Sequence, residues 1–186
     1  MHLCKLGYTY LDDLTSYNPQ TNILTDIFIR SVKRLNPALT DLECSQLLDK
    51  IVGILNNDDL GKEFYTMLSS NSGVKLIDFA DANNNEWHVT TEFTCENVES
   101  GDSFRPDITC FINGLPLAFI EVKKPNNHDG ILAERDRINK RMRSKSFRRF
   151  INLTQLMIFS NNQEYDNENR VPIQGAFYCC AAKERA

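Results

Sequence analysis

Apolar side chains in the first third of the chain recur at helical spacing. The pattern runs through residues 20–35, after which Pro37 stops the predicted helix. Two further helices are predicted, one beginning at residues 40–41 and one over residues 58–68. Residues 1–72 are therefore expected to form an N-terminal helical segment.

Beyond residue 73 the pattern changes to the period of two that strands show. Strands are predicted over residues 74–80, 87–94, 105–112, 115–123, 155–160 and 174–180. A charged helix over residues 134–149 separates the first strands from the last two. This order predicts an α/β fold with a mixed β-sheet flanked by helices. We expect residues 73–186 to form its core, with residues 1–72 packed on it in one compact domain.

An Asn-Gly pair at residues 113–114 separates the two strands of a predicted β-hairpin. Both residue types tolerate the positive φ angles of tight hairpin turns. A three-residue loop would pair Ile112 with Pro116. In that register Asp107 lies directly opposite Glu121, and a two-residue loop moves this pairing by one position.

The three-residue-loop register places Asp107, Glu121 and Lys123 on one polar face of the hairpin, because side chains alternate between the faces of a strand. The other face carries apolar side chains alone, and we expect it to be buried. Its members are Ile108, Cys110, Ile112, Ala118, Ile120 and Val122.

Two neighbouring carboxylates repel each other unless a cation lies between them. Mg²⁺ is suited to such a place, because it binds one or two carboxylates together with waters and phosphate oxygens. We predict that Asp107, Glu121 and the carbonyl of Val122 bind the metal. Lys123 would then orient the attacking water or stabilise the transition state of phosphodiester hydrolysis. The alternative is a half-exposed strand with a solvated Glu-x-Lys pair, which is common in antiparallel sheets.

Charge is distributed unevenly along the 186 residues, 41% of which are hydrophobic. The net charge is −4, yet residues 134–149 alone carry +6 and the remainder −10. A basic element is what phosphate binding requires, because each neutralised phosphate releases a counterion. An ordinary solvated helix face explains the same charges equally well.

The sequence contains neither a signal-peptide pattern nor an apolar run long enough to span a membrane. Its six cysteines include no Cys-x-x-Cys pair, and its three histidines are scattered. These features predict a cytoplasmic protein with reduced thiols and argue against a zinc site.

Several short phrases of the sequence occur together in a known family. Around the hairpin these are Arg-Pro-Asp-Ile at 105–108, Phe-Ile-Asn-Gly-Leu-Pro-Leu at 111–117 and Ile-Glu-Val-Lys-Lys-Pro at 120–125. Others are Leu-Gly-Tyr at 6–8, Arg-Leu-Asn-Pro at 34–37, Leu-Ile-Asp-Phe at 76–79 and Asn-Glu-Trp-His-Val-Thr at 85–90. Over most of its length the chain thus resembles the N-terminal nuclease domain of the R subunit of type I restriction–modification enzymes.

The resemblance implies a restriction-endonuclease-like core and cleavage of double-stranded DNA with Mg²⁺, for which Mn²⁺ can substitute. It implies that Asp107 and Glu121 are metal ligands and Lys123 is the catalytic lysine. Asp26 on the first long helix is a candidate accessory acid. The candidate DNA-binding residues are Arg105, Lys124, Arg137, Lys140 and Arg141.

The family also implies partners, namely the methylase and specificity subunits and two ATP-driven translocase domains that follow the nuclease domain. The sequence contains no GxxxxGK[ST] phosphate loop, so ATP is implied for those further domains alone. Many members carry Gln-x-x-x-Tyr on the helix after Glu-x-Lys, whereas this chain has Arg137 and Arg141 there. We therefore expect a domain or truncated subunit that cuts poorly without its motor.

Two alternatives to this interpretation stay open. The chain could be a free-standing repair or junction nuclease of the same fold, which the missing motor favours. It could instead be a non-catalytic module that docks DNA or the methylase. The intact Asp107, Glu121 and Lys123 argue against the second alternative, because a docking module gains nothing from two repelling carboxylates.

Overall fold

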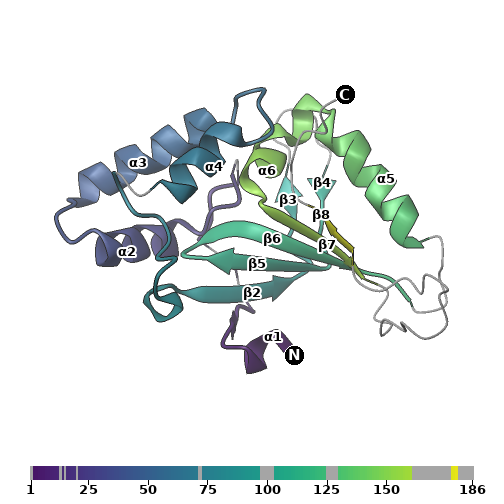
Figure 1. Ribbon diagram of the computed structural model, residues 1–186, viewed down its shortest axis with the longest axis horizontal. Helices are drawn as coiled ribbons and strands as arrows, with labels where there is room; N and C mark the ends of the chain where they lie inside the picture. Colours follow the sequence, from purple (N-terminus) through teal and green to yellow (C-terminus); the bar gives the residue numbers. More distant parts are fainter. Residues whose placement is uncertain are drawn as a thin grey trace.

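A mixed β-sheet forms the centre of the computed structural model, which describes residues 2–12, 14, 16–19, 21–70, 73–96, 103–124, 130–160 and 177–179 (Figure 1). Within these residues the sheet has six strands in the order β1-β2-β5-β6-β7-β8. They are β1 (Thr9–Tyr10), β2 (Trp87–Thr91), β5 (Ile108–Ile112), β6 (Leu115–Val122), β7 (Leu156–Ser160) and β8 (Phe177–Cys179). The pairs β1–β2 and β6–β7 are parallel, and the other three pairs are antiparallel. The predicted mixed sheet is thereby confirmed.

Two groups of helices lie on the sheet, with α2, α3 and α4 near the β5–β6 turn and α5 and α6 toward the other end (Figure 1). The helices are α1 (His2–Lys5), α2 (Thr25–Leu35), α3 (Asp41–Ile54), α4 (Lys62–Ser69), α5 (Gly130–Met142) and α6 (Arg148–Leu153). Short 3₁₀ turns are η1 (Ala82–Asn84) and η2 (Lys145–Phe147), and a small second sheet pairs β3 (Cys95–Glu96) with β4 (Ser103–Phe104). The α/β fold with flanking helices is as predicted. No helix among the described residues has the length and apolar character needed to cross a membrane.

The predicted helix over residues 134–149 is instead divided. Its first part belongs to α5, which ends at Met142, and α6 begins only at Arg148. Between them the hydroxyl of Ser144 accepts a hydrogen bond from the backbone N–H of Ser146 and starts η2. Serine side chains offer the backbone such local alternatives to a continuous helix. The basic charges are consequently spread over two helices and a corner.

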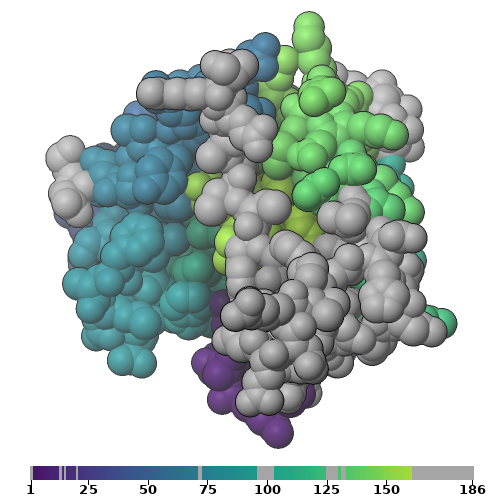
Figure 2. All heavy atoms as spheres, turned by 45° about the vertical axis from the view of Figure 1, so that its right-hand side comes forward, coloured from purple at the N-terminus to yellow at the C-terminus, as the bar shows by residue number. Residues whose placement is uncertain are grey.

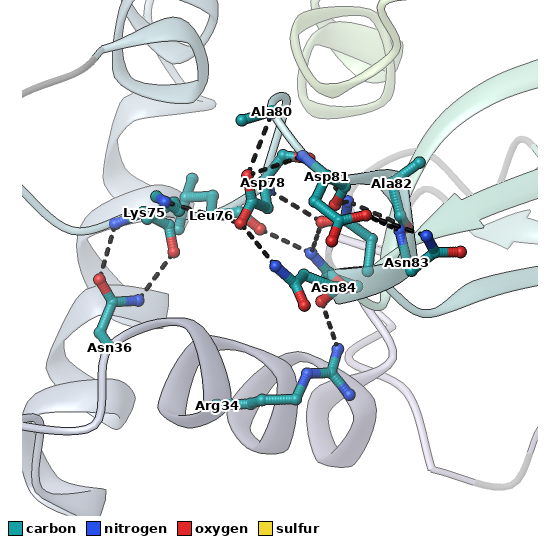
Figure 3. A network of polar contacts seen from close by, with 12 residues as sticks. Arg34, Asn36, Lys75, Leu76, Asp78, Ala80, Asp81, Ala82, Asn83 and Asn84 are labelled. Carbon is teal, nitrogen blue, oxygen red and sulfur yellow. Dashed lines mark hydrogen bonds and ion pairs between the residues drawn. The ribbon is translucent and has the colours of Figure 1, made fainter.

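Residues 74–80 do not form the predicted strand. The amide side chain of Asn36 instead donates to the carbonyl of Lys75 at 2.8 Å and accepts from its N–H at 2.9 Å. Asn113 donates to the carbonyl of Leu76 at 2.9 Å. Figure 3 shows asparagine and aspartate side chains in contact with this segment. Because these side chains already satisfy its backbone groups, the segment needs no neighbouring strand.

The other predicted strands are found with changed limits. The strand predicted over residues 87–94 ends at Thr91, and the one predicted over 155–160 begins at Leu156. Of residues 174–180, the structure describes 177–179, which form β8; the rest of that prediction lies outside the described residues. Strand β1 comes from the N-terminal segment and was not predicted, and the proposed division at residue 72 stays a prediction.

Helices α5 and α6 cover the face of the sheet that carries Glu121. Phe119, two positions earlier on β6, is buried against Phe104, Phe150 and Phe159 in a core that also includes Ile138 of α5. Since alternate strand residues share a face, Glu121 points to the same side.

The expectation that the opposite face is the buried one was wrong. Cys110 is buried, but Ile108, Ile112, Ala118 and Ile120 are only half-buried, and Val122 is 41% exposed. The large aromatic side chains of β5, β6 and β7 lie on the Glu121 face. They bury more apolar area than the smaller side chains of the other face, and the helices therefore pack against them.

The β5–β6 turn combines both of the registers considered for the hairpin. The loop has two residues, because Ile112 pairs with Leu115, and Asn113 and Gly114 adopt φ angles of 51° and 80°. The register then shifts between Cys110 and Phe111, and Ile108 pairs with Ile120. A β-bulge has this effect, because one strand carries an extra residue. Asp107 thus arrives opposite Glu121, as the three-residue loop would have placed it.

Gly114 fixes where the hairpin lies against α2. A Cβ atom on this residue would come within 2.6 Å of the carbonyl oxygen of Leu24 and 2.7 Å of the nitrogen of Phe28. The N–H of Leu24 also donates to the carbonyl of Gly114 at 2.9 Å. Only glycine permits both this approach and a positive φ at this position. The turn end of the hairpin is therefore anchored to the first long helix.

Candidate active site

Asp107, Glu121 and Lys123 meet where the β5–β6 hairpin opens. Asp107 directly precedes β5, and its Oδ2 accepts a hydrogen bond of 2.7 Å from the backbone N–H of Val122. The Lys123 ammonium lies 3.5 Å from Oε2 of Glu121. The backbone N–H of Lys123 donates to the carbonyl of Ser160 at 2.7 Å, which continues the pairing of β6 with β7. The three residues are thus brought together, as the hairpin pattern predicted.

Glu121 is an ionisable group in an unfavourable environment. It is 4% exposed, and its Oε1 is buried without a hydrogen-bond partner among the described residues. Burial, together with the charges of Asp107 and Glu134, raises the pKa of Glu121 to about 7, although Lys123 opposes the shift. A buried oxygen of this kind is costly unless a cation or a proton satisfies it.

The donor atoms at this place fit a hard divalent cation. The described residues contain no group of three or more His, Cys, Asp or Glu side chains that could hold a metal ion. The protein donors are therefore two carboxylates, Asp107 and Glu121, with the carbonyl of Val122 as the third candidate. Mg²⁺ accepts such a sparse set, because it keeps several of its waters and shares phosphate oxygens with the substrate.

Glu134 of α5 is a fourth member of the cluster that sequence reasoning missed. Its Oε2 lies 3.2 Å from the Lys123 ammonium and 2.9 Å from Nη1 of Arg137. Its Oε1 lies 3.7 Å from Arg141. The spacing Glu134, Arg137, Ile138, Arg141 was a usable signal, because these positions share one side of a helix. From the sequence alone, this acid entered only the net charge of residues 134–149.

The surrounding carboxylates keep the Lys123 side chain protonated. Partial burial lowers the pKa of Lys123, but the hydrogen bond to Glu134 and the charges of Glu134, Glu121 and Asp107 more than offset this effect and raise it. The lysine is therefore a cation at neutral pH. It can stabilise negative charge on a phosphate but cannot act as a general base.

The candidate DNA-binding residues lie in different environments. Arg137 and Arg141 form the ion pairs with Glu134, and the Arg141 guanidinium also stacks over the ring of Phe104 at 4.1 Å. Arg105 lies 3.7 Å from Glu92 in an exposed ion pair. Lys124 and Lys140 are exposed. Their contact with DNA stays a prediction.

Asp26 is not brought to the other acids. Its Oδ2 accepts a hydrogen bond of 2.7 Å from the hydroxyl of Ser16, and it lies in the first turn of α2. That end of α2 contacts the β5–β6 turn through Leu24 and Gly114. On β6, Glu121 is six residues beyond Leu115, and at the usual rise of a strand these two residues are about 20 Å apart.

Comparison with known proteins places this hairpin and its helices in a family. Residues 1–166 match the family model described as type I restriction enzyme R protein N terminus. The chain is 37% identical to the "Putative type I restriction enzyme MjaIXP endonuclease subunit" of Methanocaldococcus jannaschii over 150 aligned residues, which cover 68% of this chain and 14% of that relative. It is 30% identical over 114 residues to the "Putative type I restriction enzyme MjaVIIIP endonuclease subunit" of the same organism, with 61% and 10% covered.

The chain therefore spans a small part of the length of these curated relatives. The family match nevertheless contains every residue of the cluster, from Asp107 to Arg141, and nearly all of the sheet. Because the match extends over most of the 186 residues, the chain belongs to the family of type I restriction enzyme R protein N-terminal domains.

Proposed function

We propose that this chain is the Mg²⁺-dependent endonuclease domain of a type I restriction–modification R subunit and hydrolyses phosphodiester bonds of double-stranded DNA. The observation that carries the proposal is the pair Asp107 and Glu121 with a charged lysine beside it, where no described residue donates a hydrogen bond to Oε1 of Glu121. Family membership and the names of the relatives support a nuclease role.

The roles of the residues follow from their contacts. When bound, Mg²⁺ or Mn²⁺ supplies a water of lowered pKa and neutralises charge on the scissile phosphate. Asp107, Glu121 and the Val122 carbonyl would hold it, and the Val122 N–H orients the Asp107 carboxylate. Glu121 would bind the metal in its ionised form. The Lys123 ammonium stabilises the charge that develops on the phosphate oxygens.

The substrate and partners are part of the same proposal. Arg105, Lys124 and Lys140 offer exposed positive charge for the phosphates of a duplex. In the space-filling view, α5 lies at an outer edge of the molecule, where a duplex can reach it (Figure 2). The methylase and specificity subunits and ATP-driven translocase domains would complete the enzyme. A reduced cytoplasm as its compartment is supported by the free thiols of Cys4, Cys44, Cys95 and Cys110.

Cleavage of supercoiled plasmid in Mg²⁺ or Mn²⁺ tests the proposal. Wild type should nick or linearise the plasmid, and Lys123→Ala should lose this activity while binding DNA nearly as well. Lys50→Ala is the matched control, because Lys50 is an exposed lysine on α3 outside the cluster. If wild type does not cut the plasmid, the reaction is repeated with the methylase, specificity and translocase components added.

The outcomes separate the alternatives. Cleavage at full rate without the methylase, specificity and translocase components would favour a free-standing nuclease. Wild-type protein that cuts under neither condition, and whose DNA binding is unaffected by Lys123→Ala, would indicate a docking module and contradict the proposal.

A further inference from the structure

Glu134 is the one carboxylate of the cluster to which the proposed reaction assigns no task. It is 3% exposed, in a helix whose exposed charged side chains are mostly basic. A buried carboxylate is retained at a cost unless cations and hydrogen bonds compensate it. Lys123, Arg137 and Arg141 provide that compensation here.

The position of Glu134 is set by the packing of α5. Ile138, one turn further along, is 2% exposed within the aromatic core that includes Phe104. Arg141, another turn on, stacks over the ring of Phe104. These two contacts attach the Glu134 face of the helix to the core. The carboxylate therefore reaches Lys123 from a separate helix, which packs on the same aromatic core as Phe119 of β6.

Lys123 needs such a partner. It lies just past the end of β6, and a lysine stem has four flexible bonds that strand geometry does not restrain. Glu121 approaches its ammonium only to 3.5 Å, whereas Glu134 comes to 3.2 Å. A carboxylate that binds a metal also has less charge to offer a neighbouring ammonium. Glu134 is then the group that remains to hold the lysine.

We propose that Glu134 is a positioning residue that holds the Lys123 ammonium beside the metal-binding carboxylates, and that Arg137 and Arg141 in turn hold Glu134. The inference rests on the proposed function, in which Lys123 acts on the phosphate. Glu134 is not a further metal ligand, because its Oε2 already faces two cations. Arg137 and Arg141 thereby receive a structural task.

The test compares Glu134→Gln with Asp136→Asn in the full chain. Both changes remove one negative charge from α5, but the Asp136 side chain is 63% exposed and pairs only with Arg135 among the described residues. The first readout is the ¹⁵N-detected NMR signal of the Lys123 ammonium without metal, assigned by its absence in Lys123→Arg. An ammonium held in an ion pair exchanges slowly and is visible, whereas a mobile one is not.

We expect the signal to disappear in Glu134→Gln and to persist in Asp136→Asn. Plasmid cleavage should fall about tenfold to a hundredfold in Glu134→Gln. It should stay unchanged in Asp136→Asn. Mn²⁺ affinity, followed by electron paramagnetic resonance of the free ion, should change less than twofold in both. Glu134→Asp, which keeps the charge but shortens its reach, should weaken the signal and provides a second variant if Glu134→Gln does not fold.

Three results would overturn the inference. One is an ammonium signal that survives unchanged in both Glu134 variants. Another is a loss of Mn²⁺ affinity of tenfold or more, which would make Glu134 a ligand. The third is full cleavage by Glu134→Gln. If wild type fails to cleave under every condition, the proposed function fails, and the ammonium signal still decides whether Glu134 holds Lys123.

Discussion

The two ends of the β5–β6 hairpin bury polar groups in opposite ways. At the turn end, Asn113 is fully buried; its Nδ2 donates to the Leu76 carbonyl and to Oδ1 of Asn85, and its Oδ1 accepts from the N–H of Glu86. At the open end, Glu121 is nearly as buried, but one of its oxygens has no hydrogen-bond partner within the described part of the chain. The turn end uses a neutral amide whose donors and acceptor are satisfied, and the open end gathers charges.

This difference separates structure from function within one element. A satisfied buried amide adds stability and specificity to the fold, because leaving its partners unpaired would be costly. An unsatisfied buried carboxylate lowers stability, so its presence indicates a ligand or a reaction that requires it. Changes at the two ends should accordingly affect different measurements.

The largest effect is expected from Glu121→Gln. Losing the negative charge should reduce metal-dependent plasmid cleavage about a thousandfold, equivalent to about 4 kcal/mol, because the amide binds Mg²⁺ poorly. The free energy of unfolding without metal should not fall, because the change removes repulsion among Glu121, Asp107 and Glu134. Cleavage assays and urea denaturation measure the two quantities. A large loss of stability would show that the two ends do not differ as described.

The next effect is expected from Asn113→Ala at the turn end. The change leaves the Leu76 carbonyl, the Glu86 N–H and Asn85 without their partners, and it should lower the free energy of unfolding by about 3 kcal/mol. Asn139→Ala on the exposed side of α5 is the control and should cost nothing measurable. Urea denaturation distinguishes them; similar midpoints for the two variants would contradict a structural role for Asn113.

The smallest effect is a pH dependence of stability that originates at the open end. The pKa of Glu121 rises from 4.5 to about 7 on folding, so the folded chain holds this proton more tightly than the unfolded chain. Its stabilising contribution is complete below about pH 4.5 and is lost as the pH rises through 7; the part lost between pH 5 and pH 8 amounts to about 2 to 3 kcal/mol.

Urea denaturation between pH 5 and 8 measures this loss. Glu121→Gln should lack this part of the pH dependence, and Mg²⁺ should restore stability to wild type at pH 8, where the ionised carboxylate can bind it. Equal Mg²⁺ stabilisation at pH 5 and pH 8 would mean that Glu121 is not the group that binds the metal.

Much of the helical and hairpin structure could be predicted because its causes are local. Thr40 and Glu43 form a reciprocal capping box at the start of α3, and the Asn-Gly pair gives the hairpin turn. The strand predicted at residues 74–80 failed for a non-local reason. Its backbone is satisfied by asparagines 36 and 113, which are distant in sequence.

The catalytic candidates and the environment around them differ in the same way. Asp107, Glu121 and Lys123 were found from sequence because a hairpin brings nearby residues into register through turn chemistry and strand alternation alone. Which face of the hairpin is buried, the bulge that corrects its register and the arrival of Glu134 at Lys123 were decided by the tertiary structure. Those outcomes depend on how α5 and α6 bury aromatic area against the sheet, a balance of packing between distant segments that no local pattern records.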